Sequence, residues 1–150
     1  MPRGERGLRS SPDLEELERR VVEFFSKRPE AVAVYIFGSA ARGEFGPGSD
    51  LDIGVFVDPG EAPIKEPSYK LRLLDELIGS LGFERVDLSL LNDSSVELQH
   101  EAVFNGRRVY CRDEGEALAL ESLVLRKWWD WQIDMRSFDE SLLRELAGDE

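Results

Sequence analysis

The sequence contains only one cysteine and one histidine among its 150 residues. A single cysteine, Cys111, allows no internal disulfide, so a reducing cytoplasm is the expected location. No apolar run approaches the roughly 20 residues of a membrane-spanning helix, and we expect no membrane association. The first residues, MPRGERGLRSSPD, lack the apolar segment of a secretory signal.

Basic residues are also scarce relative to acidic ones. Nineteen Lys and Arg stand against 31 Asp and Glu, which gives a net charge of −12. Such a charge repels a phosphate backbone, so we expect no direct binding of nucleic acid. The length and the 41% hydrophobic content suit one domain with a sizeable core. We therefore expect a flexible tail over residues 1–10 and a single domain over 11–150, of which 114–150 form a helical extension.

Helical and strand-like patterns alternate along the chain. Ser11 is the expected N-cap of the first helix, with Pro12 at its first position. Apolar runs and two-residue alternation predict strands, whereas apolar residues three and four apart predict helices. The expected strands cover 31–37, 51–57, 85–91 and 107–111, and the expected helices cover 12–27, 39–42, 69–81, 95–105 and 114 onward, with a break near Ser137. This order predicts an α/β fold in which helices flank a mixed sheet.

Two acidic residues stand one residue apart at the start of an apolar strand, in the stretch SDLDIGVFV. Residues i and i+2 of a strand point to the same face, so Asp50 and Asp52 are expected to project side by side. Like charges this close repel each other, and a cation relieves the repulsion. Carboxylate oxygens suit Mg²⁺, which prefers phosphate oxygens for much of its remaining coordination. Gly54 follows on the same face and is expected to leave room for a ligand.

A third acid belongs to the next expected strand, where Asp87 alternates with apolar residues in VDLSL. Asp87 therefore points away from the core, and it can join the first two acids if the two strands are neighbours. Three carboxylates can hold two metal ions. A two-metal site stabilises both the attacking and the leaving oxygen of an in-line phosphoryl displacement.

A candidate phosphate site precedes the acids. Gly38 and Ser39 lie between a buried strand and the start of a short helix. Free backbone N–H groups and the helix dipole favour an anion there, and a glycine lets a phosphate approach closely. Arg42, one helical turn later, can place a guanidinium near the same phosphates. The stretch from 36 to 58 thus predicts a phosphate site, a turn and a metal site in succession.

The stretch GSAARGEFGPGSDLDIGVFV resembles the signature of the DNA polymerase beta-like nucleotidyltransferases, and most closely that of the minimal nucleotidyltransferases. RVDLSLL resembles the segment that carries the third acid of that family, and LQHEAVFNGRRVYCRDE resembles its usual ending. The resemblance covers about residues 14–114. The helical end resembles, less distinctively, the antitoxin members encoded beside HEPN-domain ribonuclease toxins.

This resemblance implies a role for each acid. Asp50 and Asp52 would bind both of two Mg²⁺ ions. Asp87 would bind the catalytic metal and accept or orient the proton of the attacking hydroxyl. The three aspartates are therefore the candidate catalytic residues and the candidate metal ligands.

The same resemblance implies the substrates. Gly38 and Ser39 would bind the β- and γ-phosphates of ATP, and Arg42 and Ser49 are further candidate nucleotide-binding residues. AMP would be transferred with release of pyrophosphate. For the antitoxin members, the acceptor would be a tyrosine of the partner HEPN toxin.

Two other functions stay open from the sequence. One is a nucleotidyltransferase of the aminoglycoside-modifying kind, although the 36 residues after Glu114 are few for the helical domain that such enzymes carry. The other is a non-catalytic antitoxin that covers a basic toxin. A homo-oligomer is also left open. Trp128, Trp129 and Trp131 suit core packing and a partner contact equally, with 128 and 131 on one helix face and 129 turned away. His100, between Glu97 and Glu101, is expected to have a surface or partly packed role and not a catalytic one.

Overall fold

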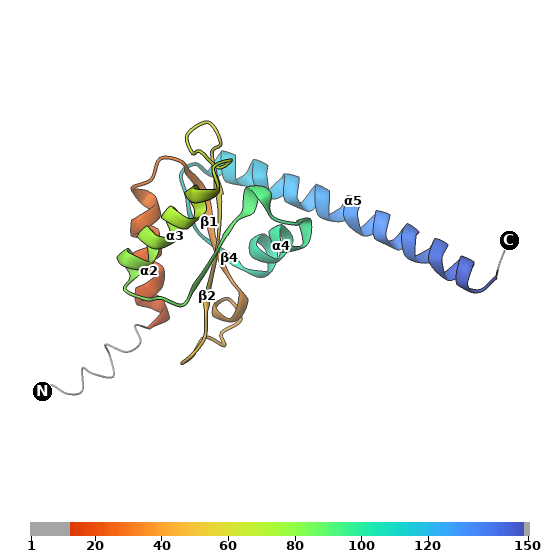
Figure 1. Ribbon diagram of the computed structural model, residues 1–150, viewed down its shortest axis with the longest axis horizontal. Helices are drawn as coiled ribbons and strands as arrows, with labels where there is room; N and C mark the ends of the chain where they lie inside the picture. The colour runs from red at the N-terminus through yellow and green to blue at the C-terminus, as the bar shows by residue number, and fades with distance from the viewer. Residues whose placement is uncertain (1–12, 149–150) are drawn as a thin grey trace, which may run out of the picture.

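The computed structural model describes residues 13–148, whose core is a four-stranded sheet (Figure 1). Its strands are β1 (Ala31–Phe37), β2 (Leu51–Val57), β3 (Val86–Leu90) and β4 (Arg107–Cys111), in the order β3-β2-β1-β4. β1 runs antiparallel to both β2 and β4, whereas β2 and β3 are parallel. All seven residues of β1 are buried, as expected for a central strand covered on both faces. The mixed sheet predicted from the sequence is confirmed.

Helices α2 (Leu14–Ser26) and α3 (Pro67–Leu81) cover one face of the sheet. The N-cap of α2 is Asp13, whose side chain accepts a hydrogen bond from the N–H of Glu16. The helix therefore begins two residues later than predicted, because a carboxylate provides the cap that we assigned to Ser11. Ser11 and Pro12, like the predicted tail over 1–10, lie outside the described residues.

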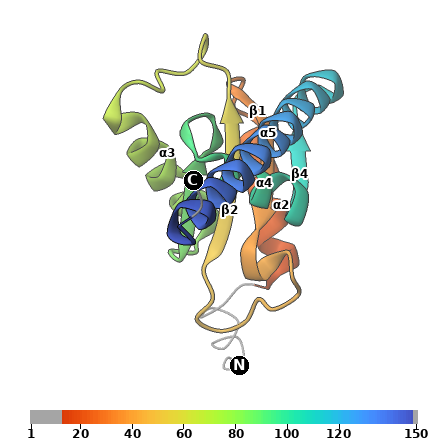
Figure 2. The ribbon, with the colours of Figure 1, turned by 90° about the vertical axis from the view of Figure 1, so that its right-hand side faces the viewer.

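The opposite face of the sheet is covered by η2 (Leu91–Asp93), α4 (Val96–His100), the π-helical turn η3 (Glu101–Asn105) and the start of α5 (Glu114–Leu146). Figure 2 shows α4 and α5 in front of the sheet on this side. A second apolar cluster fills the layer between them and includes Tyr35, Phe56, Leu91, Ala102, Ala117 and Val124.

Helix α5 begins on the sheet and then projects far beyond it (Figure 1). Its first turn is capped by Asp113, and a network of polar side chains holds it to the sheet. The buried hydroxyl of Tyr35 donates to Glu121 at 2.7 Å, and Arg108 donates to the same carboxylate at 2.8 Å. The break predicted near Ser137 is wrong. A serine costs a helix only a few tenths of a kcal/mol relative to alanine, roughly, which is too little to end it.

None of the helices in residues 13–148 combines the length and the apolar composition needed to cross a bilayer.

Candidate active site

Asp52 and Asp87 lie directly opposite each other on the parallel strands β2 and β3. Leu51, Ile53 and Val55 belong to the apolar cluster under α2 and α3, so alternation turns Asp52 to the other face. Asp87 is exposed on β3, an edge strand of the sheet. The expected meeting of these two acids is therefore present in the structure.

The pKa of Asp52 is raised above its ordinary value. Partial burial is the largest cause, followed by the negative charges of Asp87 and Asp50 and by contact with the carboxyl group of Asp87. Arg42 acts in the opposite direction on this pKa, although more weakly. Asp52 is thus a carboxylate whose charge is poorly compensated within the described residues, and a bound cation would compensate it.

Gly38 touches this carboxylate. It has a φ of 71°, in the left-handed region that favours glycine, and it opens the short 3-10 helix η1 (Gly38–Ala40) after β1. A Cβ at this position would collide with Oδ2 of Asp52. The sequence suggested that Gly38 makes room for a phosphate. In the structure the missing side chain also makes room for Asp52, while Ser39 lies beside it in η1.

Asp50 directly precedes β2, as the predicted strand bounds of 51–57 imply, and its carboxylate is 3.5 Å from Nε of Arg85. Arg85 also donates to the carbonyl of Gly48 at 2.6 Å, so it fixes the turn that leads into β2. The negative charge of Asp50 contributes to the raised pKa of Asp52, and the side-by-side projection of the two carboxylates stays a prediction. Arg85 was missed from the sequence, although its place two residues before Asp87 was a usable signal.

The other predicted nucleotide-binding residues lie on the loop between η1 and β2. Arg42 is exposed and pairs with Glu44 at 3.0 Å, yet it is close enough to Asp52 to affect its pKa. Ser49 closes a turn. Its hydroxyl accepts from the N–H of Gly46 at 3.0 Å, and its own N–H donates to the Gly46 carbonyl at 3.0 Å. Ser49 thus has a local structural role here.

The space predicted at Gly54 is filled. A Cβ there would approach the side chain of Leu91 to 3.0 Å, so η2 packs directly on this part of β2. The expectation that Gly54 leaves room for a ligand is wrong, since the missing side chain serves close packing instead. A ligand therefore has no space between this part of β2 and η2.

The donor set fits a divalent cation, although the acids are not yet gathered around one point. Among residues 13–148, no three His, Cys, Asp or Glu side chains are close enough together to hold a metal ion. Asp52 and Asp87 are paired, while Asp50 is held by Arg85. Hard carboxylate oxygens with an uncompensated charge suit Mg²⁺, which needs few protein ligands. Asp52 and Asp87 could hold such an ion as the structure stands, and Asp50 could join them by turning away from Arg85.

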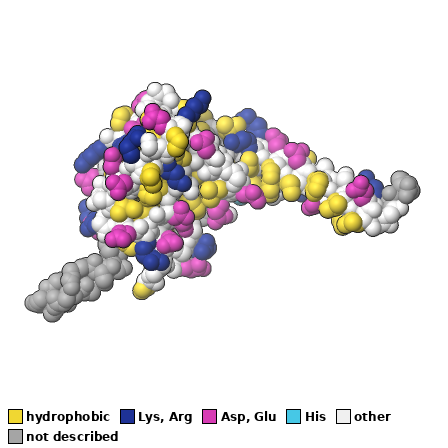
Figure 3. Space-filling model, viewed as in Figure 1, with side chains coloured by type: hydrophobic (Ala, Val, Ile, Leu, Met, Phe, Trp, Pro, Cys, Tyr) yellow, Lys and Arg dark blue, Asp and Glu magenta, His cyan; other side chains and the backbone are white. Residues whose placement is uncertain are grey.

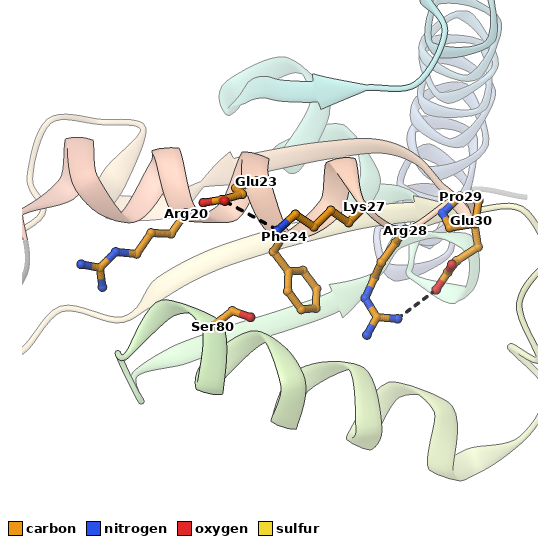
Figure 4. Close-up of a pocket in the computed structure, with 8 residues that line it drawn as sticks. All are labelled: Arg20, Glu23, Phe24, Lys27, Arg28, Pro29, Glu30 and Ser80. Atoms are coloured by element: carbon orange, nitrogen blue, oxygen red, sulfur yellow. Dashed lines mark hydrogen bonds and ion pairs between the residues drawn. The ribbon is translucent and has the colours of Figure 1, made fainter.

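A separate groove of about 520 Å³ lies between α2 and α3, on the far side of the sheet from Asp52 (Figure 4). Its charged groups are engaged with one another. Arg28 pairs with Glu30 at 3.2 Å and also with Glu76, and its guanidinium lies over the ring of Phe24. These contacts bind α2 to α3, and the groove is not part of the acidic site.

The tryptophans of α5 lie on two faces of the helix, as their spacing predicted, with Trp128 and Trp131 together and Trp129 apart. Trp128 stacks on His100 with ring centres 3.9 Å apart, and Trp131 stacks on Trp128 at 5.2 Å. Trp129 points away and is 56% exposed. His100 is half-buried and stacked, so of the surface or partly packed roles expected from the sequence it has the partly packed one.

Comparison with known proteins places this geometry in a family. The family model of the polymerase beta nucleotidyltransferase domain matches residues 19–115. A structure assigned to the minimal nucleotidyltransferases is 35% identical, with 65% of this chain and 97% of that chain covered and a TM-score of 0.53. No curated protein sequence matches this chain significantly.

Two more distant structures come from toxin–antitoxin complexes. One chain of a complex with AMP-PNP is 20% identical, with 84% of this chain and 98% of that chain covered and a TM-score of 0.67. The other belongs to a complex of an MNT antitoxin with a tri-AMPylated HEPN toxin of Shewanella oneidensis, at 17% identity, 86% and 98% coverage and a TM-score of 0.63. The matched domain spans more than half of the sequence and includes every strand of the sheet. The chain therefore belongs to the polymerase beta nucleotidyltransferase family and has its fold.

Proposed function

We propose that this nucleotidyltransferase is an antitoxin that transfers AMP from ATP, with Mg²⁺, to a tyrosine of a partner HEPN toxin encoded nearby. The observation that carries the proposal is the pairing of Asp52 with Asp87 beside the left-handed Gly38. This pairing supports a metal–phosphate site at one end of the sheet. The similarity to one chain of a complex with AMP-PNP and to one of a complex with an AMPylated HEPN toxin supports the donor and the partner.

Different residues would bind the phosphates, hold the metal ions and accept the proton. Backbone N–H groups around Gly38 and Ser39 would bind the β- and γ-phosphates, and Arg42 would add a positive charge to them. Asp50, Asp52 and Asp87 would hold two Mg²⁺ ions, whose chemistry is to stabilise negative charge on the reacting oxygens. Asp87 would also accept the proton of the acceptor hydroxyl. The hydroxyl oxygen then bonds to the α-phosphorus as the bond to the bridging oxygen breaks and pyrophosphate leaves.

The exposure of Asp87 supports a large acceptor. Asp87 lies on an edge strand, so a tyrosine carried by a folded protein can approach it from outside the sheet. In-line transfer needs that hydroxyl about 3–3.5 Å from the phosphorus, which a protruding tyrosine can reach. The net charge of −12 also favours encounter with a basic ribonuclease.

The test is incubation with ATP, Mg²⁺ and the neighbouring HEPN protein, followed by mass measurement of both chains. We expect the partner to gain one or more AMP units on tyrosine. Asp87→Asn should abolish this gain yet still bind the partner. Asp93→Asn is the matched control, because Asp93 is an exposed acid in η2 outside the pair.

Three results would contradict parts of the proposal. AMP transfer to an aminoglycoside but not to the HEPN protein would identify a small-molecule enzyme. Full neutralisation of the toxin by Asp87→Asn, without a mass change for either protein, would indicate an antitoxin that acts by binding alone. Equal transfer by the wild type and Asp87→Asn would remove Asp87 from the mechanism.

A further inference from the structure

The apolar stripe that packs α5 onto the sheet continues beyond the sheet. Ala117 and Val124 are buried against the domain, and the same three- and four-residue spacing leads to Trp128. It then continues through four residues of the projecting part, which we name the distal stripe: Trp131, Met135, Phe138 and Leu142. Met135 and Leu142 are each 41% exposed and Phe138 is 60% exposed. Apolar side chains on this part of α5 are visible in Figure 3.

The distal stripe has the form of a helix-pairing surface. Alternating spacings of three and four keep apolar residues on one seam of a helix, which is the pattern of coiled coils. From residue 131 to 146 the helix is about 24 Å long at 1.5 Å per residue. A segment of this length is only marginally helical by itself in water. A second helix laid along the stripe would both bury it and stabilise the segment.

The sequence of the distal stripe is complementary to itself. We infer that a second copy of this chain covers it, with the two α5 helices antiparallel and crossing between Arg136 and Ser137. In this register, residues whose numbers sum to 273 lie opposite each other. Met135 then faces Phe138 of the second copy, and Trp131 faces its Leu142. Each of the four stripe residues thus meets an apolar partner, and none is left over.

The residues beside the seam are also compatible with self-pairing. Asp134 falls next to Ser141 of the second copy, and Gln132 next to its Asp139, so no like charges meet there. Leu125 and Leu146, which are 39% and 75% exposed, lie beside each other at the ends of the overlap. The antiparallel register therefore covers further apolar surface without creating repulsion along the seam.

The distribution of charge favours the same arrangement. Residues 125–146 contain four bases and five acids, although the whole chain has a net charge of −12. The distal helix is thus nearly neutral, and nearly all the excess negative charge lies on the rest of the chain. Antiparallel pairing brings the neutral segments together and leaves the two acidic bodies at opposite ends of the pair, where their repulsion is screened.

The test is sedimentation of the full chain over a range of concentrations. We expect its mass to rise from 17.0 kDa toward twice that value. Phe138→Asp should weaken this association by at least about tenfold, because it places a charge in the seam. Ile133→Asp is the matched control. Ile133 is 56% exposed on the opposite side of the helix, so this variant should associate like the wild type.

Crosslinking tests the register itself in a Cys111→Ser background. Met135→Cys and Phe138→Cys chains should form a disulfide-linked dimer far more readily when mixed than either does alone. A monomer at every concentration, including one that associates only with a HEPN partner, would overturn the inference. It would be overturned equally if Ile133→Asp disrupted the dimer as strongly as Phe138→Asp, or if mixing the two cysteine variants gave no more crosslinking than each alone.

Discussion

Replacing Asp52 by asparagine should stabilise the protein in the absence of metal. Asp52 is partly buried beside Asp87, and its raised pKa reflects both the burial and the neighbouring negative charges. Asparagine has nearly the same shape and carries no charge, so it removes both penalties. An amide also gives Asp87 a hydrogen-bond donor. Replacement of a functional residue that lowers stability is expected to raise the free energy of unfolding.

The size of the effect follows from the strand spacing. Two unit charges about 5 Å apart repel by ~3 kcal/mol at an effective dielectric constant of about 20, and by ~1 kcal/mol in bulk water. Asp87 is exposed, so the lower value applies. For a chain of this length, ~1 kcal/mol corresponds to a rise in Tm of about 2–4 °C. Asp50→Asn should give no such rise, because it also loses the contact with Arg85.

Thermal unfolding in EDTA and in Mg²⁺ with ATP measures both parts of this prediction. A ligand at about 100 times its Kd adds ~2.7 kcal/mol to the stability of the state that binds it. The wild type should show this stabilisation as a rise in Tm. Asp52→Asn should have a higher Tm than the wild type in EDTA, and its Tm should rise little with Mg²⁺ and ATP. If Asp52→Asn unfolds below the wild type in EDTA, the repulsion argument is wrong. If it gains as much from Mg²⁺ and ATP as the wild type, Asp52 does not hold the metal.

Three further predictions concern Gly38 in the site, the anchoring of α5 by Tyr35, and the ion pairs of Arg112. Gly38→Ala should lose the rise in Tm that Mg²⁺ and ATP produce. Gly43→Ala is its control, because Gly43 has a similar φ but no atom near an added Cβ. Both variants should lose about 1–3 kcal/mol of stability through backbone strain, but Gly43→Ala should keep the rise in Tm. Tyr35→Phe should lower the free energy of unfolding by about 1–2 kcal/mol in denaturant titration, since it removes the buried hydrogen bond to Glu121. Arg112 lowers the pKa of two carboxyl groups that it pairs with, so its stabilisation is present above their unfolded pKa values and is lost as pH falls through the lower folded values. Arg112→Gln should therefore flatten the decline of Tm between neutral and acidic pH.

The sequence predicted what depends on local periodicity. Alternation alone placed Asp52 and Asp87 on the solvent side of their strands, and the apolar run of β1 predicted its burial on both faces. From the sequence we had to assume that β2 and β3 are neighbours, because no local pattern specifies which strands pair. The register that sets Asp52 opposite Asp87 is a property of the packed sheet.

The errors arose where side chains from distant segments compete. The sequence did not predict that the guanidinium of Arg85, 35 residues later in the chain, pairs with the carboxylate of Asp50. The space at Gly54 was expected to be open, but Leu91 packs into it from η2. The helix cap moved from Ser11 to Asp13, since two good capping residues stood close together and the sequence does not rank them. Each of these outcomes depends on tertiary contacts or on small energy differences.

The three acids of the site lie on backbone segments of different rigidity, which determines which of them can adjust. Asp52 is fixed in a strand with neighbours on both sides, and its carboxylate occupies the space that a Cβ at Gly38 would need. Asp87 lies on an edge strand but is held by its register with β2. Asp50 precedes the strand and is restrained by one exposed contact to Arg85, of a kind that contributes only about 0–1 kcal/mol. The ion pair that holds Asp50 is therefore weak, and Asp50 is the acid of the three that can turn toward a metal ion most easily.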